Sequence, residues 1–177
     1  MNVNIDIRRI EGGIVEQVDV VVIGGGQSGL ATAYALRRRG LEPVVLEASE
    51  EAAGSWPRYY DSLTLFSPAG YSSLPGLPFG GDPDRYPHRD EVVAYLLRYA
   101  SHLDAEIRTR TRVHEVRLGD GAFTVGLEGG RWLTARAVVA ATGSFGSPHR
   151  PALPGLDGFT GTVLHAAGYH VPEGFAG

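Results

Sequence analysis

The clearest hydrophobic pattern lies near the start of the chain, where two short apolar runs flank a longer mixed segment. Residues 20–23 read Val-Val-Val-Ile, and residues 43–46 read Pro-Val-Val-Leu. Short runs rich in β-branched residues are typical of strands that are buried on both faces of a parallel sheet. Residues 30–39 between them are rich in Ala, Leu and Arg and stop at Gly40, as in a helix that ends at a left-handed glycine. The pattern predicts a strand–helix–strand unit.

Further along, the pattern predicts one more helix and then a set of strands. Residues 90–102 carry a single apolar stripe at helical spacing, and Asp90 is the expected N-cap. Beyond them apolar and polar positions alternate, and glycine-containing turn signals interrupt the alternation twice. We therefore expect three antiparallel strands and then one buried parallel strand, at residues 113–118, 122–127, 131–135 and 137–141.

Three stretches show neither the apolar spacing of a helix nor the alternation of a strand. Residues 1–17 form an irregular leader with a short strand expected within residues 3–10, and residues 147–177 are rich in turn-forming residues. Residues 52–86 combine prolines and glycines with many aromatic residues, and only residues 63–65 suggest a short strand. Because this segment is too apolar for a solvated linker, we expect an ordered wrap that packs on the domain or on a ligand.

The composition limits both the architecture and the chemistry. A chain of 177 residues with 43% hydrophobic and 20% charged residues is typical of one globular domain. A net charge of -4 gives no electrostatic case for nucleic acid. No apolar run reaches membrane-spanning length and no secretory signal is visible, so a cytoplasmic location is expected. The absence of cysteine excludes dithiol redox chemistry, and the absence of lysine excludes a Schiff-base lysine.

The turn between the first strand and the first helix carries the strongest chemical signal. Gly24, Gly26 and Gly29 form a G-x-G-x-x-G motif, which permits a tight turn, close approach of a pyrophosphate, and close packing of helix on sheet. The free N–H groups and the positive end of the helix dipole favour phosphate there. Glu47 ends the second strand, where its carboxylate can accept hydrogen bonds from an adenosine ribose and would repel the 2′-phosphate of NADP. This order of elements predicts a dinucleotide site.

Two alternative functions are compatible with the motif. Glu47 suits NAD as well as FAD, so an NAD-dependent dehydrogenase is one of them. The other is a non-catalytic nucleotide-binding remnant, because the sequence holds one G-x-G-x-x-G, no G-x-S-x-G and no metal-ligand spacing among its histidines. The antiparallel strands and the small-residue turn at Thr142 and Gly143 favour FAD.

Three further motifs point to one enzyme family. Residues 54–56 read Gly-Ser-Trp, and residues 141–143 read Ala-Thr-Gly with several prolines after them. Residues 159–169 match the fingerprint F-x-G-x-x-x-H-x-x-x-[FY] at every defined position, with His165 as its histidine, although His170 stands where proline or aspartate is usual. With the glycine motif, they make the chain resemble the N-terminal FAD-binding part of the flavin-containing monooxygenases, which include N- and S-oxygenases and Baeyer–Villiger enzymes.

The resemblance and the pattern together imply an α/β fold. We expect a Rossmann-like FAD-binding domain, a parallel sheet with helices, that carries an inserted three-stranded antiparallel meander. The expected organisation is a leader at residues 1–17, the FAD-binding domain at residues 18–158 with the meander at about 113–135, and a fingerprint tail at residues 159–177. In the family that tail leads to an NADPH domain, which is absent from these residues.

The resemblance also implies roles for individual residues. His165 would lie between the flavin and nicotinamide domains, and no other catalytic residue and no metal site are expected. Trp56 suits a core position as well as the border of the flavin. The resemblance places Gly24, Gly26, Gln27, Ser28 and Gly29 at the pyrophosphate of FAD and Glu47 and Ala48 at the adenosine ribose. It places Gly54, Ser55 and Trp56 at the flavin, Val113 at the adenine, and Thr142 and Gly143 near the pyrophosphate and ribityl chain.

The activity implied is that of the family. NADPH would reduce FAD, and FAD would then use O2 to oxygenate a small organic substrate. The family's second G-x-G-x-x-G, which binds NADPH, does not occur among the 177 residues. We therefore expect the FAD-binding portion of such an oxidoreductase, inactive alone, with a complementary C-terminal fragment or self-association as its protein partner and with neither nucleic acid nor membrane as a partner.

Overall fold

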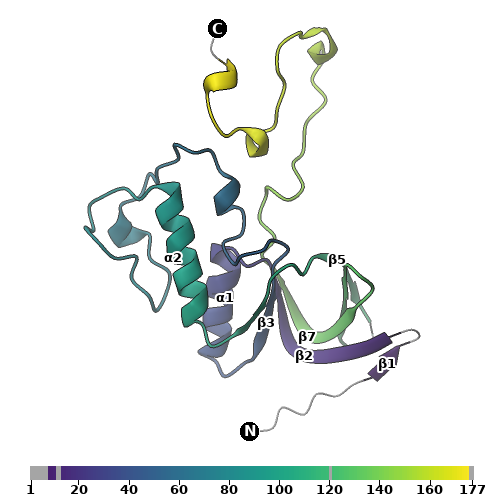
Figure 1. Ribbon diagram of the computed structural model, residues 1–177. Coiled ribbons are helices and arrows are strands. Elements are labelled where there is room, and N and C mark those ends of the chain that lie inside the picture. Colours follow the sequence, from purple (N-terminus) through teal and green to yellow (C-terminus); the bar gives the residue numbers. More distant parts are fainter. Residues whose placement is uncertain (1–7, 11–12, 120, 176–177) are drawn as a thin grey trace.

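The computed structural model describes residues 8–10, 13–119 and 121–175 (Figure 1). Within them lie two α-helices, α1 (Gln27–Arg37) and α2 (Arg89–His102). The strands are β1 (Arg8–Ile10), β2 (Gly13–Ile23), β3 (Pro43–Leu46), β4 (Glu106–Arg108), β5 (Val113–Leu118), β6 (Phe123–Leu127) and β7 (Trp132–Ala140). All seven strands belong to one sheet of order β4-β3-β2-β7-β6-β5, and β1 pairs with β2 outside this path.

The parallel half of the sheet contains the predicted strand–helix–strand unit. β2 pairs in parallel with β3 and with β7, and β3 pairs in parallel with β4. All four residues of β3 are buried, as its continuous apolar run predicts. α1 covers this part of the sheet, where Ala33 joins Val22 and Val45 in one apolar cluster. The helix runs from Gln27 to Arg37, and Gly40, three residues beyond its end, has a φ of 76°, which confirms the expected left-handed glycine. The α/β fold class is confirmed.

β7 replaces two of the predicted strands. Separate strands at residues 131–135 and 137–141 were expected, but the chain runs unbroken from Trp132 to Ala140. Its first half pairs with antiparallel β6, and its whole length pairs in parallel with β2. Because the strand is central in the sheet, it contacts a different neighbour on each side. The antiparallel meander of β5, β6 and β7 is therefore continuous with the parallel sheet instead of being inserted beside it.

The beginning of the chain is more regular than the sequence indicates. β2 starts at Gly13 and pairs with β7 from Val15 onward, so the irregular leader expected up to residue 17 is wrong in its second half. β1 pairs antiparallel with the start of β2, with Ile10 opposite Gly13. The remainder of the expected leader, including most of the strand expected within residues 3–10, lies outside the described residues.

The second helix begins with a histidine cap. The side chain of His88 accepts a hydrogen bond from the N–H of Asp90, and the carboxylate of Glu91 accepts one from the N–H of His88 at 2.9 Å. This reciprocal capping box makes His88 the N-cap, so the prediction of Asp90 is wrong. Thr64 forms a single antiparallel bridge with His88 in place of the short strand expected at residues 63–65.

Residues 52–86 form the expected wrap, and they pack on α2 (Figure 1). The ring of Phe79 stacks on that of Tyr95 with 4.6 Å between the ring centroids. The segment and the helix share one apolar cluster, whose buried members include Ala52, Ala53, Ala69, Phe79, Val92, Tyr95, Leu96 and Tyr99. Among the aromatic residues of the wrap, Phe79 is buried in this cluster and Trp56 packs against it, whereas Phe66 and Tyr71 are exposed.

Two tyrosine hydroxyls attach the wrap to α2. The hydroxyl of Tyr95 accepts a hydrogen bond from the N–H of Leu74 at 2.6 Å and donates one to the carbonyl of Leu77 at 2.7 Å. The hydroxyl of Tyr99 donates to the carbonyl of Pro75 at 2.7 Å. Burial raises the pKa of Tyr99 to about 12, so this donor stays protonated at any physiological pH.

Replacing Tyr95 with phenylalanine should lower the free energy of unfolding by about 1–3 kcal/mol, because the Leu74 N–H and the Leu77 carbonyl both lose their partner. Urea denaturation followed by circular dichroism measures the change. The matched control is Tyr86→Phe, since the Tyr86 side chain is exposed and should tolerate the same loss of a hydroxyl. Equal stabilities of the two variants would contradict this account of the wrap.

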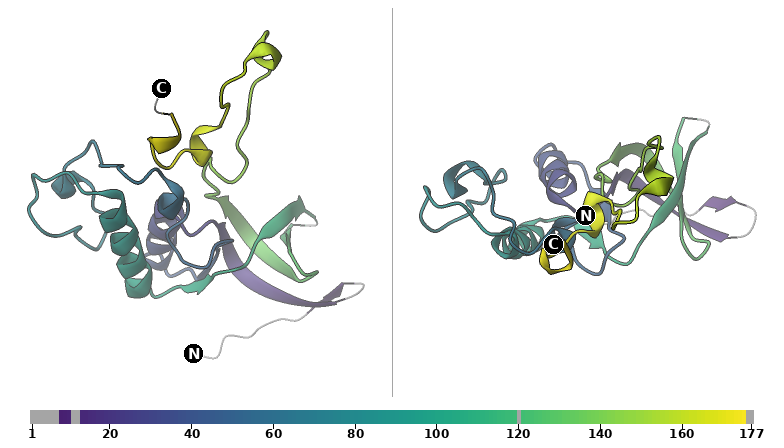
Figure 2. Two further views of the ribbon diagram at one scale, coloured as in Figure 1. Left: turned by 45° about the horizontal axis from the view of Figure 1, so that its top comes forward. Right: turned by 90° about the horizontal axis from the view of Figure 1, so that it is seen from above.

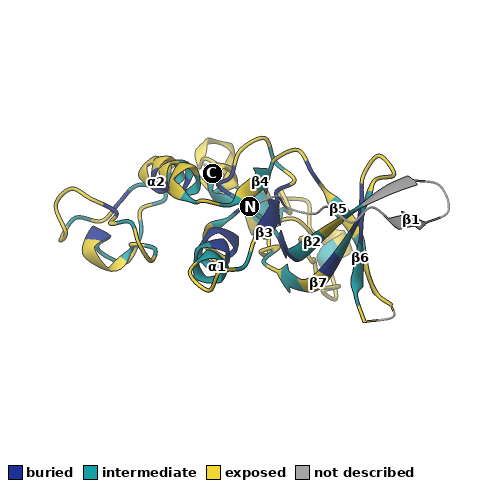
Figure 3. Ribbon diagram, turned by 90° about the horizontal axis from the view of Figure 1, so that it is seen from below, coloured by how far each residue is buried: buried dark blue, intermediate teal, exposed yellow. Residues whose placement is uncertain are grey.

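The tail extends away from the sheet (Figures 1 and 2). It contains three short 3-10 turns, η3 (Leu156–Gly158), η4 (Ala166–Gly168) and η5 (Glu173–Phe175). It returns to the wrap, where the carbonyl of His170 accepts a hydrogen bond from the N–H of Asp61 at 2.9 Å. In Figure 3 the buried residues concentrate around β2, β3 and α1. No helix within residues 8–10, 13–119 and 121–175 is long and apolar enough to cross a membrane.

Candidate functional site

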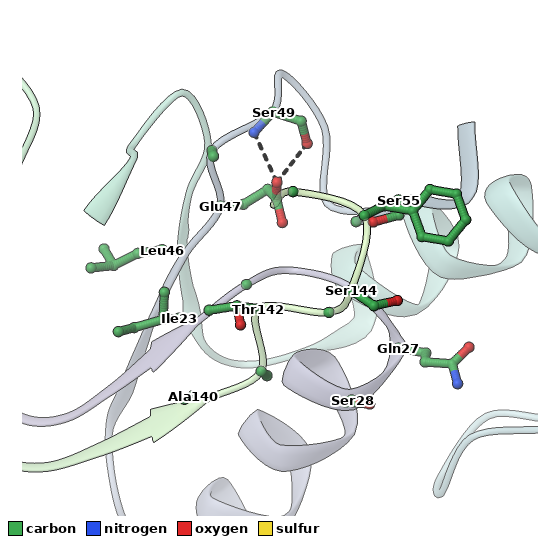
Figure 4. Close-up of a pocket in the computed structure, with 18 of the residues that line it drawn as sticks. Ile23, Gln27, Ser28, Leu46, Glu47, Ser49, Ser55, Ala140, Thr142 and Ser144 are labelled. Atoms are coloured by element: carbon green, nitrogen blue, oxygen red, sulfur yellow. Dashed lines mark hydrogen bonds between the residues drawn. The ribbon is translucent and has the colours of Figure 1, made fainter. Parts of the chain in front are cut away.

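The carboxyl ends of β2, β3 and β7 open onto one cavity of about 810 Å³ (Figure 4). Such an edge is where open α/β sheets bind ligands. The turns that follow these strands, the loop around residue 55 and the connection from β4 to β5 form its wall. Most residues that the sequence predicts to bind a cofactor line it, namely Gly24, Gly26, Gln27, Ser28, Glu47, Ala48, Gly54, Ser55, Trp56, Val113, Thr142 and Gly143.

The glycine turn is wedged between the ends of β3 and β7. The N–H of Gly24 donates to the carbonyl of Leu46 at 2.8 Å. Gly24 has a φ of 107°, and a Cβ added to it would lie 2.3 Å from the carbonyl oxygen of Ala141. Glycine is required here both by the backbone conformation and by the close approach of β7.

Gly26 and Gly29 differ in what surrounds them. A Cβ on Gly29 would lie 1.8 Å from the carbonyl oxygen of Gly24, so this glycine is required by packing beneath the turn, and it is not on the cavity wall. A Cβ on Gly26 would meet only the Cα of Gly54, at 3.5 Å, which is an ordinary contact. The protein's own packing therefore leaves free the space above Gly26. Gly26 is the N-cap of α1 and makes no side-chain capping bond, so the helix N-terminus is available to an anion.

A second loop approaches the glycine turn closely. Gly54 has a φ of 60°, and a Cβ on it would lie 2.7 Å from the Cα of Gly26. The indole N–H of Trp56 donates to the side-chain oxygen of Gln27 at 3.1 Å. Trp56 is half-buried, lines the cavity and packs on the wrap's apolar cluster.

Glu47 is a buried carboxylate on the cavity wall, with 6% of its surface exposed. Its Oε2 accepts a hydrogen bond from the N–H of Gly25 at 2.6 Å. Its Oε1 accepts bonds from the N–H of Ser49 at 2.8 Å and from the hydroxyl of Ser49 at 2.7 Å (Figure 4). These three donors replace water around the charge, which is the condition for burying a carboxylate. Through the hydrogen bond from Gly25, the Glu47 side chain links the end of β3 to the glycine turn.

Aromatic rings line another part of the wall. The ring centroids of Trp56 and Tyr59 are 5.1 Å apart, and those of Tyr59 and Phe145 are 4.5 Å apart. Sequence reasoning did not select the latter two residues, because loop residues follow no period. Their place after a strand's carboxyl end was the available signal. The same holds for other lining residues in loops and short turns that it missed, among them Ser49, Arg58, Thr111, Arg112, Ser144, Gly146 and Ser147, whereas the missed Thr32 lies in α1.

His165 lies apart from the cavity wall, in the tail. Its Nδ1 accepts a hydrogen bond from the N–H of Ala167 at 3.0 Å and caps the turn η4. In the residues that the structure describes, this contact is local, and the ring is half-buried.

Comparison with known proteins adds independent findings. The family model for pyridine nucleotide-disulphide oxidoreductases matches residues 21–172. A solved flavin-containing monooxygenase from Stenotrophomonas maltophilia is 45% identical, with a TM-score of 0.86 over 91% of this chain and 49% of its own. The chain belongs to the flavin-containing monooxygenases of this family. Because it has no cysteine, the family's disulphide chemistry cannot be carried by these residues.

Two further proteins are similar to this chain over most of its length. The rice protein named indole-3-pyruvate monooxygenase YUCCA1 (Oryza sativa subsp. japonica) is 40% identical over 160 residues, which cover 89% of this chain and 39% of the rice protein. A solved structure of OTEMO in complex with FAD and NADP is 28% identical, with a TM-score of 0.66 over 85% of this chain and 30% of its own. The chain thus spans two fifths of the rice protein's length and about half of the Stenotrophomonas chain.

Proposed function

We propose that the chain is the FAD-binding portion of a flavin-dependent monooxygenase that uses NADPH and O2 to oxygenate a small organic substrate. The observation that carries the proposal is the convergence of the glycine turn, Glu47 and the loop of Trp56 on one cavity. Membership of the flavin-containing monooxygenases supports it, and so does the similarity to OTEMO, which was solved with FAD and NADP.

The groups on the cavity wall match the chemistry of each part of FAD. A diphosphate needs hydrogen-bond donors and positive potential, which the N-terminus of α1 supplies above Gly26. The space a Cβ would take at Gly26 is left for that group. Glu47 offers carboxylate oxygens to the hydroxyls of a ribose. The aromatic rings of Trp56 and Tyr59 offer apolar surface to a flat ring system.

Each proposed contact is assigned to residues of this chain. Gly24, Gly26, Gln27 and Ser28 would bind the diphosphate, with Gly29 fixing the helix beneath them. The remaining contacts would be made by Glu47 and Ala48 to the ribose, Val113 to the adenine, Thr142 and Gly143 to the diphosphate and ribityl chain, and Gly54, Ser55 and Trp56 to the flavin. When bound, FAD supplies the electron transfer and the reaction with O2, and the protein orients it.

Glu47 also bears on which nucleotide the cavity accepts. Its carboxylate would face the 2′-phosphate that distinguishes NADP from NAD, and two negative groups at hydrogen-bond distance repel each other. NADPH would therefore bind elsewhere. His165, in the tail, would face the nicotinamide-binding part of the complete enzyme.

Calorimetric titration of the purified chain with FAD, ADP-ribose and NADP tests the proposal. We expect FAD and ADP-ribose to bind and NADP to bind at least about tenfold more weakly, since the 2′-phosphate meets Glu47. Gly26→Val should lower the FAD affinity by about 100-fold, because the side chain occupies the space of the diphosphate and a charged group loses its donors. A preference for NADP would overturn the assignment.

The control for Gly26→Val is Gly158→Val. A Cβ on Gly158 meets nothing within 4 Å, so the same side chain should leave FAD binding unchanged there. Gly26→Ala serves as a second variant, because its Cβ makes an ordinary contact with Gly54 and the fold should persist. Circular dichroism confirms that each variant is folded before its affinity is compared.

A further inference from the structure

The hydrogen bonds of Glu47 leave little of its carboxylate free. A carboxylate has about four acceptor positions, two on each oxygen. Ser49 fills both positions of Oε1 with its N–H and its hydroxyl, and Gly25 fills one position of Oε2. The direction of the carboxylate is therefore set mainly by Ser49, a residue that lines the same cavity (Figure 4).

The turn that carries Ser49 is itself held from the opposite side. The carbonyl of Ser49 accepts a hydrogen bond from the N–H of Arg110, and the carbonyl of Glu47 accepts one from the N–H of Thr111, both at 2.8 Å. Arg110 has a φ of 50°, a left-handed conformation that side chains other than glycine seldom adopt. A conformation of this kind persists only where its surroundings enforce it. The connection from β4 to β5 is therefore fixed at Arg110, and its hydrogen bonds hold the backbone of Glu47 and Ser49 in place.

The hydroxyl of Ser49 has one proton and two acceptors within reach. It lies 2.7 Å from Oε1 of Glu47 and 2.8 Å from the carbonyl oxygen of Glu51. The carboxylate is the charged acceptor of the two, so the proton is expected on Oε1. One acceptor position on Oε2 then remains for a hydroxyl group from a ligand.

We infer that Ser49 is a positioning residue for ribose recognition. Its hydroxyl stays on Oε1 and aims the carboxylate of Glu47, so that the remaining acceptor position on Oε2 receives a hydrogen bond from a hydroxyl of an adenosine ribose. The inference rests on the proposed FAD site and adds to it the residue that sets its preference for ribose. Orienting Glu47 requires the hydroxyl of Ser49 in addition to its backbone N–H.

The test uses the adenosine half of FAD in two forms, ADP and 2′,3′-dideoxy-ADP, titrated into the intact 177-residue chain by calorimetry. The wild type should prefer ADP by at least about tenfold, as expected for hydrogen bonds to a charged group. Ser49→Ala should lower the ADP affinity by about three- to tenfold and leave the dideoxy-ADP affinity unchanged, so that the preference shrinks by the same factor. Ser49→Thr keeps the hydroxyl and should restore the preference.

The matched control is Glu50→Gln, in the same turn. Glu50 is exposed and pairs with Arg110 at 3.1 Å instead of facing the cavity, so this variant should keep the preference for ADP. A Ser49→Ala variant that weakens both ligands equally would show a general effect on the fold and overturn the inference. So would a variant that binds both ligands as the wild type does. Failure of the wild type to bind ADP and FAD would overturn the proposed function as well, which separates the two results.

Discussion

The 177-residue chain loaded with FAD should consume NADPH no faster than free FAD does. Hydride transfer requires the nicotinamide to be held against the flavin, and orientation of this kind is worth about 7–11 kcal/mol of the barrier. Under the proposed function Glu47 would disfavour NADP in the cavity, and the sequence contains one G-x-G-x-x-G motif, at Gly24 to Gly29. The motif proposed for FAD therefore has no second copy among the 177 residues that could bind NADPH.

The rate of NADPH consumption, followed as the loss of NADPH absorbance in the presence of oxygen, tests this expectation. Free FAD at the same concentration gives the background, and the Stenotrophomonas flavin-containing monooxygenase, which is about twice as long, gives the positive control. Consumption well above the background by the 177-residue chain alone would show that NADPH binds productively within it. In that case the argument from Glu47 against NADP would be wrong.

Replacing Gly29 with alanine should strongly destabilise the fold. The new Cβ would lie 1.8 Å from the carbonyl oxygen of Gly24, and both partners are backbone, so either the start of α1 or the turn must move. We expect a loss of about 3 kcal/mol or more, which is a large part of the 5–15 kcal/mol that stabilises a typical domain. Urea denaturation followed by circular dichroism measures it.

The comparison with Gly26 gives this prediction its control. Gly26→Ala adds the same methyl group three residues earlier, in ordinary contact with Gly54, and should change the free energy of unfolding by less than about 1 kcal/mol. One glycine of the motif is thus expected to matter for folding and the other for the ligand. Similar stabilities of the two alanine variants would contradict the division of roles within the motif.

The parts of the fold that the sequence predicts well are those with a local cause. A continuous β-branched run is buried whatever its neighbours are, so the strand ending at Ile23 and the strand at Pro43–Leu46 could be placed from their own residues. The glycine motif likewise specifies a turn, a helix start and a position relative to the sheet. Because parallel strands end at one edge, the convergence of Glu47 and Thr142 on a common cavity followed from their positions after strands.

The errors arise where a distant partner decides the structure. Residues before Val18 carry no strong apolar pattern, yet β2 extends to Gly13 because β7 pairs with it from Val15 onward and β1 pairs with its first residues. β7 appears as two segments in the sequence, yet it runs unbroken because β2 pairs with its whole length while β6 pairs only with its first half. His88 is an uncommon N-cap, and Asp90 fits the usual preference better, but Glu91 completes a capping box with the histidine. The role of Ser49 depends on where Glu47 turns, which sequence spacing alone does not state.

The pairing of β2 with β7 has a consequence for the synthesis of the protein. β2 and the glycine turn leave the ribosome early, but Ile23 pairs with Ala140 and Gly24 fits against Ala141, which are made much later. Until then one edge of β2 has no native partner and is open to pairing with other chains. The wall of the cavity on this side is missing for the same period. Under the proposed function, cofactor binding would therefore follow the synthesis of residue 141, and a nascent chain interrupted before it would carry the complete glycine motif without this wall of the cavity.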